Sequence, residues 1–130
     1  WKSELLTEFD PFETGLDRFV RMDKGTFVGK EALQKRMKSG SKRKLATFEV
    51  QCKDRPAFGG ASVMRGAEVV GTLTSGDWGH RVGMNLAMGF VVPDLATPGT
   101  VVDLDLLGDR IPATVIAPCP YDPDFTLLRG

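Results

Sequence analysis

The sequence predicts a mainly β fold, a small antiparallel β-barrel of about six strands preceded by a short α-helical linker segment. Short apolar runs with alternating polar residues recur at regular spacing from residue 44 to residue 117. Glycine, proline and aspartate separate these runs, which indicates turns between strands. The chain has 130 residues, 42% of them apolar, which suffices for one buried core. We therefore expect a linker over residues 1–43 and a barrel over residues 44–130. A closed barrel is favoured over an open sheet because closure leaves no exposed strand edges.

The linker is expected to contain one clear helix. Residues 29–39 (GKEALQKRMKS) carry cations in the last turn, where the helix dipole favours them, and Gly40 offers a left-handed cap. Residues 1–28, called the lead-in segment below, have no long helical pattern. Their apolar residues at spacings of three and four indicate either a short helix or a compact apolar loop: Phe12, Leu16, Phe19 and Val20.

The strands follow from a change of period after Gly40. In the first run, Ala46, Phe48 and Val50 alternate with polar residues, as in a half-buried strand. Arg65-Gly66 predicts a hairpin turn, Gly108-Asp109 predicts another, and residues 74–79 (TSGDWG) are expected to form a loop. The expected strands cover residues 44–52, 61–64, 67–74, 86–92, 100–107 and 110–117.

Composition excludes several classes of protein. Seventeen basic residues balance seventeen acidic ones, which argues against a dedicated nucleic-acid binder. No apolar run is long enough for a transmembrane helix, so no membrane partner is expected. Cys52 and Cys119 have no metal-ligand spacing, and we expect two reduced, half-buried thiols in a cytosolic type of compartment. His80 is the single histidine, so neither a metal site nor a hydrolase triad is expected.

Four segments could carry ligand contacts, and each has a plainer structural explanation. Trp78, in the loop expected at residues 74–83, could cap an apolar pocket or fill a barrel corner, and we favour the corner. The basic residues 30–44 indicate an anion-binding patch or, more commonly, a solvated face. Asp17 is expected to pair with Arg18 or Arg21, although either arginine could bind a carboxylate. The proline-rich tail, residues 118–123, could hold an aromatic ring against a neighbouring surface.

Three segments in this order resemble the C-terminal end of the glycine-cleavage T-protein (aminomethyltransferase) family. They are DPFETGLDRFVRMDKGTFVGKEAL, VVGTLTSGDWGHRVGMNLAMGFV and TPGTVVDLDLLGDRIPATVIAPCPYDP. Within the family, the likeness is greatest to the folate-binding half of dimethylglycine and sarcosine dehydrogenases or oxidases. It covers about residues 1–125.

The resemblance implies a role in one-carbon chemistry. Family members bind tetrahydrofolate and transfer a one-carbon unit to it from an amine, and the dehydrogenase branch adds an FAD domain. The family's catalytic aspartate lies upstream of the matching region, so no catalytic residue is expected in this chain. By position, Arg18 and Tyr121 are the candidate folate contacts. Arg18 replaces an aromatic residue of other members, which points to a contact with the anionic glutamyl tail.

The expected partners are therefore in the rest of a longer protein. The resemblance implies a missing N-terminal folate-binding domain, a small-molecule amine that reaches the site through that parent, and a cytoplasmic location, or the mitochondrial matrix in a eukaryote. We expect no buried carboxylate pair in this chain, and no catalysis by it alone. Two alternatives remain, a non-enzymatic folate-fold accessory protein and a barrel for protein contacts. The accessory relatives carry a cysteine where this chain has Thr26, which argues against the first alternative.

Overall fold

The computed structural model describes residues 3–129, and its main body is a closed antiparallel barrel. Six strands follow one another around the barrel in the order β1-β4-β3-β2-β5-β6, and β6 pairs again with β1. The predicted fold class is therefore confirmed. The strands are β1 (Lys44–Val50), β2 (Ser62–Arg65), β3 (Glu68–Gly79), β4 (Met84–Val91), β5 (Val101–Leu106) and β6 (Asp109–Ile116).

The barrel interior is filled by the apolar residues of the alternating pattern. Phe48, Val63, Leu104 and Ala113 are fully buried, and they come from four different strands. In β5 the burial alternates along the strand, and Asp103 and Asp105 point outward as predicted. These residues form one packed apolar cluster at the centre of the barrel, as is typical of small barrels.

Two hairpins form close to their predicted places. The β2–β3 turn contains Gly66, whose φ is +61°, and the β5–β6 turn contains Leu107 and Gly108, with φ values of +60° and +95°. Two consecutive positive φ values are typical of the type I′ turn, which matches the strand twist. The β5–β6 turn therefore lies one residue earlier than predicted, and it leaves Leu107 84% exposed.

The loop expected at residues 74–79 is wrong, because these residues extend β3. They pair with β4 from Ser75 opposite Met88 to Gly79 opposite Met84, after a β-bulge near Leu73. A Cβ atom on Gly76 would lie 2.7 Å from the backbone carbonyl of Ala57. This glycine therefore serves the close approach of the 51–61 loop to the strand and does not bend the chain.

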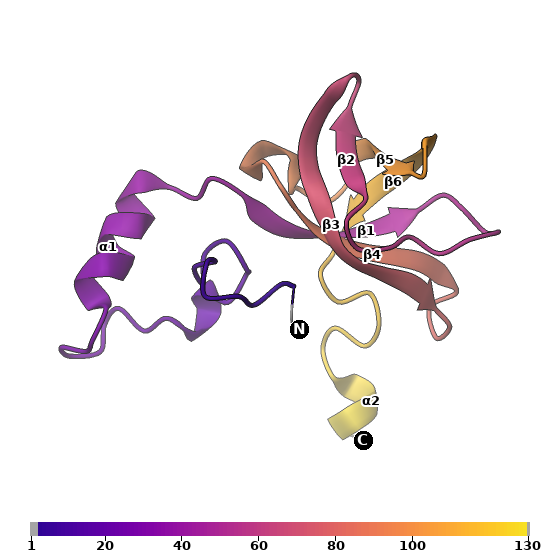
Figure 1. Ribbon diagram of the computed structural model, residues 1–130. Coiled ribbons are helices and arrows are strands. Elements are labelled where there is room, and N and C mark those ends of the chain that lie inside the picture. The colour runs from indigo at the N-terminus through magenta and orange to yellow at the C-terminus, as the bar shows by residue number, and fades with distance from the viewer. Residues whose placement is uncertain (1–2, 130) are drawn as a thin grey trace.

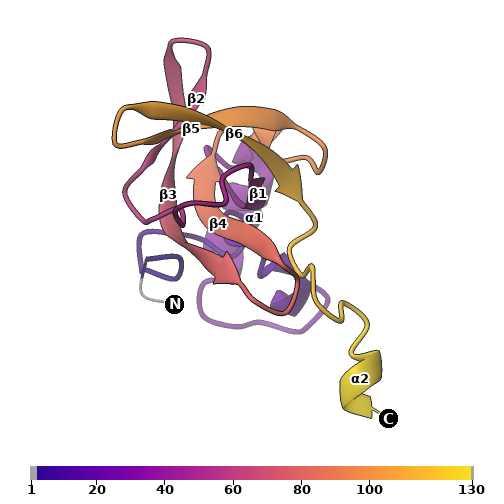
Figure 2. The ribbon, with the colours of Figure 1, turned by 90° about the vertical axis from the view of Figure 1, so that its right-hand side faces the viewer.

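The described segments outside the barrel include two helices and two 3₁₀ turns. Helix α1 (Lys30–Ser39) ends at Gly40, whose φ is +73° and whose N–H donates to Arg36 O at 3.1 Å. In Figure 1, α1 stands to the left of the barrel, and the tail runs below it to the short α2 (Thr126–Arg129). The turned view in Figure 2 also shows α2 projecting from the barrel. The 3₁₀ turns are η1 (Asp17–Phe19) and η2 (Pro93–Leu95).

The lead-in segment is a compact loop, not a helix. Successive turns and η1 make up its described part, so the loop alternative is confirmed. Its Glu13 carbonyl accepts a 2.7 Å hydrogen bond from the Leu45 N–H at the start of β1. The ring of Phe9 lies 4.2 Å from that of Phe90 on β4, measured between centroids. These contacts attach the lead-in segment to one side of the barrel.

Candidate functional site

Tyr121, one of the two predicted folate contacts, lies in the tail beside the turn between β3 and β4. Arg81 in that turn donates a hydrogen bond from Nη1 to the Tyr121 hydroxyl at 3.1 Å. The guanidinium carbon of Arg81 also lies 5.5 Å from the centroid of the tyrosine ring, within the range of a cation–π contact. Tyr121 is 41% exposed, so part of its ring remains available to a ligand.

An open apolar groove of about 350 Å³ lies where the tail crosses β3 and β4. Trp78, Leu86 and Met88 line it from the strands, and Pro118 and Pro120 line it from the tail. Trp78 is half-buried here and is no part of the core, so the favoured corner role was wrong and the pocket alternative holds. A groove of this size with an indole wall can accept a flat aromatic group.

Arg18, the other predicted folate contact, lies in η1 and is exposed. Its guanidinium carbon is 4.8 Å from the Phe19 ring centroid. The expected pairing with Asp17 is wrong, because among residues 3–129 no ion pair joins Asp17 to Arg18 or Arg21. Arg21 instead binds Asp23 at 3.0 Å, and this bond lowers the pKa of the Asp23 carboxyl below its ordinary value.

The two candidate residues do not meet in the described part of the chain. No hydrogen bond, ion pair or ring contact joins Arg18 to Tyr121 within residues 3–129, and each lies on a separate segment outside the barrel. The structure therefore presents two exposed groups, a cation on the lead-in segment and an aromatic ring on the tail. A ligand that touches both would have to bridge these two segments.

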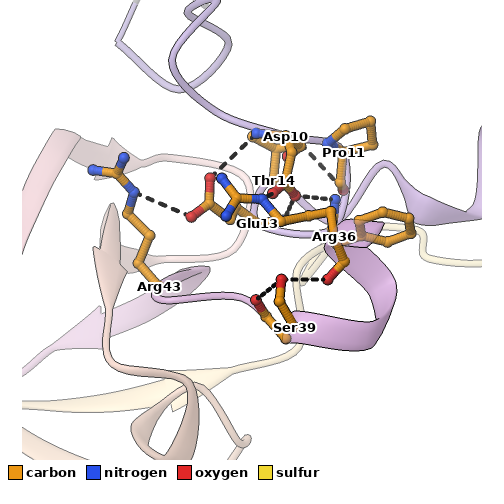
Figure 3. Close-up of polar contacts among 9 residues, drawn as sticks. Asp10, Pro11, Glu13, Thr14, Arg36, Ser39 and Arg43 are labelled. Atoms are coloured by element: carbon orange, nitrogen blue, oxygen red, sulfur yellow. Dashed lines mark hydrogen bonds and ion pairs between the residues drawn. The ribbon is translucent and has the colours of Figure 1, made fainter. Parts of the chain in front are cut away.

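One carboxylate of the lead-in segment is buried, and a second lies half-buried beside it. Glu13 is 1% exposed, and Asp10 has 14% of its side chain exposed. Figure 3 shows the two side chains between Arg36 of α1 and Arg43 of the linker. Arg36 Nε lies 2.5 Å from Asp10 Oδ2, and Arg43 Nε lies 3.4 Å from Glu13 Oε1. Of these two carboxylates only Glu13 is buried, and the sequence did not indicate their cluster because the two arginines that neutralise them are distant in sequence.

This cluster holds the lead-in segment in place and offers no free base. Asp10 Oδ1 accepts hydrogen bonds from the N–H groups of Phe12 and Glu13, both at 2.9 Å. The guanidinium carbon of Arg43 lies 4.5 Å from the ring centroid of Phe9, so it also covers an aromatic contact. Within the basic stretch, the half-buried Arg36 and the exposed Arg43 bind these carboxylates, whereas the lysines at positions 35, 38, 42 and 44 are exposed.

Asn85 on β4 is a buried polar residue that the sequence did not single out. Its Nδ2 donates to the carbonyls of Cys52 and Arg55 at 3.0 and 2.9 Å, and its Oδ1 accepts from the Ala57 N–H at 3.1 Å. All three partners belong to the 51–61 loop, so Asn85 holds this loop against the barrel. An asparagine inside an apolar run was the available signal, because a buried amide needs such partners.

The remaining candidate groups show no catalytic arrangement. His80 is exposed, and residues 3–129 contain no group of three or more metal-ligating side chains. Both cysteines are free, as predicted, but Cys52 is buried and Cys119 is exposed, so neither thiol is half-buried. Cys52 Sγ donates to Asp54 Oδ1 at 2.8 Å, and this bond lowers the pKa of the Asp54 carboxyl. Within the described residues, the helices are too short or too polar to cross a membrane.

Known proteins share both the sequence and the fold of this chain. It is 36% identical over 117 residues to mitochondrial dimethylglycine dehydrogenase of Mus musculus, which covers 89% of this chain and 14% of that protein. It is 34% identical to an aminomethyltransferase of Saccharopolyspora erythraea, over 88% of this chain and 32% of that protein. The chain therefore spans a third or less of the length of these relatives.

A solved structure gives the same fold. The crystal structure of the glycine cleavage system aminomethyltransferase T from Bartonella henselae superposes with a TM-score of 0.82 and 24% identity. The match covers 90% of this chain and 33% of the solved one. The family model for the glycine cleavage T-protein C-terminal barrel domain matches residues 43–122, which include β1 to β6 and the tail as far as Tyr121. The chain belongs to the family of glycine cleavage T-protein C-terminal barrel domains.

Proposed function

We propose that this chain is the C-terminal barrel of a longer tetrahydrofolate-dependent protein and that it closes one side of the folate site without catalysing the reaction alone. One observation carries the proposal. Nearly all of the chain matches aminomethyltransferases and dimethylglycine dehydrogenases, but it accounts for only 14% to 32% of their length. The reacting groups are then supplied by an N-terminal folate-binding domain of the same parent, which is the chain's main partner.

Two features of the outside of the barrel support a contact with folate. Tetrahydrofolate joins a flat bicyclic ring and a benzoyl ring to a glutamate with two carboxylates. The ring of Tyr121 and the apolar wall around Trp78 suit flat groups, and the exposed Arg18 guanidinium suits a carboxylate. When bound in the parent, the folate accepts the one-carbon unit. The residues of this chain would hold its ring or its glutamyl end.

The ion pairs of Glu13 and Asp10 support a non-catalytic role for this chain. Glu13 and Asp10 are each engaged by an arginine and by backbone N–H groups, so neither is free to accept a proton from a substrate. The amine substrate, and FAD in a dehydrogenase parent, would bind to the other domains. We place such a parent in the cytoplasm, or in the mitochondrial matrix of a eukaryote.

Calorimetric titration with tetrahydrofolate tests the proposal. The isolated 130-residue chain should bind weakly or not at all, whereas the parent protein should bind the folate and catalyse transfer. Tight binding or turnover by the chain alone would show that it holds a complete site. Failure of the parent to bind tetrahydrofolate would refute the folate dependence itself.

A barrel for protein contacts is the second candidate, and one observation favours it. Phe19 is 66% exposed and Val28 is fully exposed, and both lie on the lead-in segment near α1. Where such side chains form a contiguous apolar patch, they mark a surface that another protein can cover. The N-terminal domain of the parent would cover the same residues. The protein-contact function is therefore distinct from the first proposal only if a separate protein binds to Phe19 and Val28. Co-purification of the intact parent with a second protein, lost in Phe19→Ser, would distinguish the two.

A further inference from the structure

Arg81 joins the tail to the barrel, and the functions proposed above do not use it. Arg81 lies in the turn between β3 and β4, and both of its described contacts are with Tyr121. The guanidinium donates to the phenol oxygen and also lies over the ring. A hydrogen bond and a cation–π contact from the same guanidinium together restrain the position of the ring.

The contact lies next to the groove in sequence, because Tyr121 follows the prolines that line it. Pro118 and Pro120 form one wall of it, and Trp78 and Met88 form the other. The wall of prolines belongs to a tail that ends in α2, which projects from the barrel in both views (Figures 1 and 2). Tyr121 directly follows these prolines. A tail that left the barrel at Tyr121 would therefore remove one side of the groove.

We propose that Arg81 is a positioning residue that holds Tyr121, and with it the tail from Pro118 to Tyr121, across β3 and β4. Arg81 itself does not need to touch a ligand. The inference rests on the proposed function in one point, namely that the ligand in contact with Tyr121 is tetrahydrofolate. Its structural part, an ordered tail that forms the second wall of the groove, is independent of folate.

The region that matches the family model includes both Arg81 and the tail from Pro118 to Tyr121. The matched region ends at residue 122, directly after the residue that Arg81 holds, and α2 lies beyond it. Prolines 118 and 120 restrict the backbone of the detached tail, so the tail loses less conformational entropy when it binds to the barrel. One hydrogen bond and one exposed cation–π contact then shift the equilibrium between bound and detached tail by roughly tenfold.

Fluorescence of Trp78 tests the structural part. The chain has two tryptophans, so a Trp1→Phe background leaves Trp78 as the single reporter. Arg81→Met should raise acrylamide quenching of Trp78 about twofold, because the prolines no longer shield the indole, and Arg81→Lys should give an intermediate value. Arg65→Met, at another exposed arginine of the barrel, is the matched control and should leave quenching unchanged.

A double-mutant cycle shows whether Arg81 acts through Tyr121. Tyr121→Phe should raise quenching in the parental background and have no further effect in Arg81→Met, because its partner is then already gone. Equal effects of Tyr121→Phe in both backgrounds, or unchanged quenching in Arg81→Met, would overturn the inference. Both side chains are partly or fully exposed, so the barrel core is unaffected by either change.

Folate binding by the intact parent separates this inference from the proposed function. Arg81→Met should weaken tetrahydrofolate binding about fivefold, and Arg81→Lys should restore part of the affinity. If quenching rises in Arg81→Met but folate affinity is unchanged in both Arg81→Met and Tyr121→Ala, the positioning of the tail is supported and the folate contact of Tyr121 is refuted. If Tyr121→Ala weakens binding but quenching in Arg81→Met is unchanged, the folate contact stands and the role of Arg81 is refuted.

Discussion

The carboxylate of Glu13 in the lead-in segment lies 3.4 Å from the guanidinium of Arg43 at the entrance to β1. Glu13 is 1% exposed, whereas 44% of the Arg43 side chain is exposed. The backbone carbonyl of Glu13 also accepts a hydrogen bond from the Leu45 N–H. The side chain and the main chain of Glu13 thus both attach the lead-in segment to the start of β1, and we call this attachment the joint. This joint sets where the lead-in segment, including Arg18, lies relative to the barrel.

Neutralising Glu13 should loosen that joint. Glu13→Gln keeps the shape of the side chain but removes its charge from a buried position beside Arg43. We expect a loss of about 1–2 kcal/mol in the free energy of unfolding, less than for a fully buried pair because Arg43 is partly solvated. Urea denaturation measures this loss. Glu31→Gln, at an exposed position of α1, is the control and should change stability by less than about 0.5 kcal/mol.

Equal stability of the two glutamine variants would show that the Glu13–Arg43 pair does not hold the lead-in segment. Amide hydrogen exchange gives a second check on the same joint. In Glu13→Gln the Leu45 N–H should exchange faster than in the parental chain, because its acceptor is the Glu13 carbonyl.

Asn85 should be the most sensitive polar residue of the barrel. Asn85→Ala removes the partner of one backbone N–H and two carbonyls in the 51–61 loop, and the side chain it removes is 2% exposed. Buried groups left without partners cost more than a net hydrogen bond, so we expect a loss of about 3 kcal/mol. Thermal and urea unfolding measure it. Gln51→Ala, an exposed amide in the same region, should be nearly neutral, and a similar loss in both variants would contradict this assignment.

Much of the barrel follows from local pattern, and β5 shows why. Its alternation of valine or leucine with aspartate places one set inside and the other outside without reference to any other segment. The order and number of the strands follow from such runs and from the turns between them. The exact turn residues do not, because the β5–β6 turn uses Leu107 in a conformation that the residue type does not favour.

The site was harder to predict because its contacts join distant segments. Glycines at positions 76 and 79 suggest bends when only neighbours in sequence are considered, although Gly76 makes room for the backbone of Ala57. The burial of Glu13 depends on Arg43 in the same way, and the position of Tyr121 depends on Arg81. The family resemblance pointed to Tyr121, but no local pattern indicates which barrel residue holds it.

The close approach at Gly76 gives a third prediction. In Gly76→Ala the new methyl group would lie 2.7 Å from the Ala57 carbonyl, a backbone contact that cannot rotate away. Strand or loop has to shift, and we expect a loss of about 2 kcal/mol in the free energy of unfolding. Gly25→Ala is the control, because no atom lies within 4 Å of a Cβ placed there. An unchanged melting temperature in Gly76→Ala would mean that the 51–61 loop does not pack on β3 as described.

The last prediction concerns the folate contact proposed for Arg18. Arg18 is exposed and forms no ion pair within residues 3–129, whereas Arg21, three positions later, is occupied by Asp23 at 3.0 Å. A guanidinium without an internal carboxylate partner can bind the glutamyl carboxylate of folate. In the intact parent, Arg18→Ala should therefore weaken tetrahydrofolate binding about fivefold, and the difference should shrink at high salt because the contact is solvent-exposed. Arg21→Ala is the matched control and should bind folate as the parental protein does. If Arg21→Ala weakens binding as much as Arg18→Ala, the effect comes from the net charge of the lead-in segment and Arg18 has no specific role.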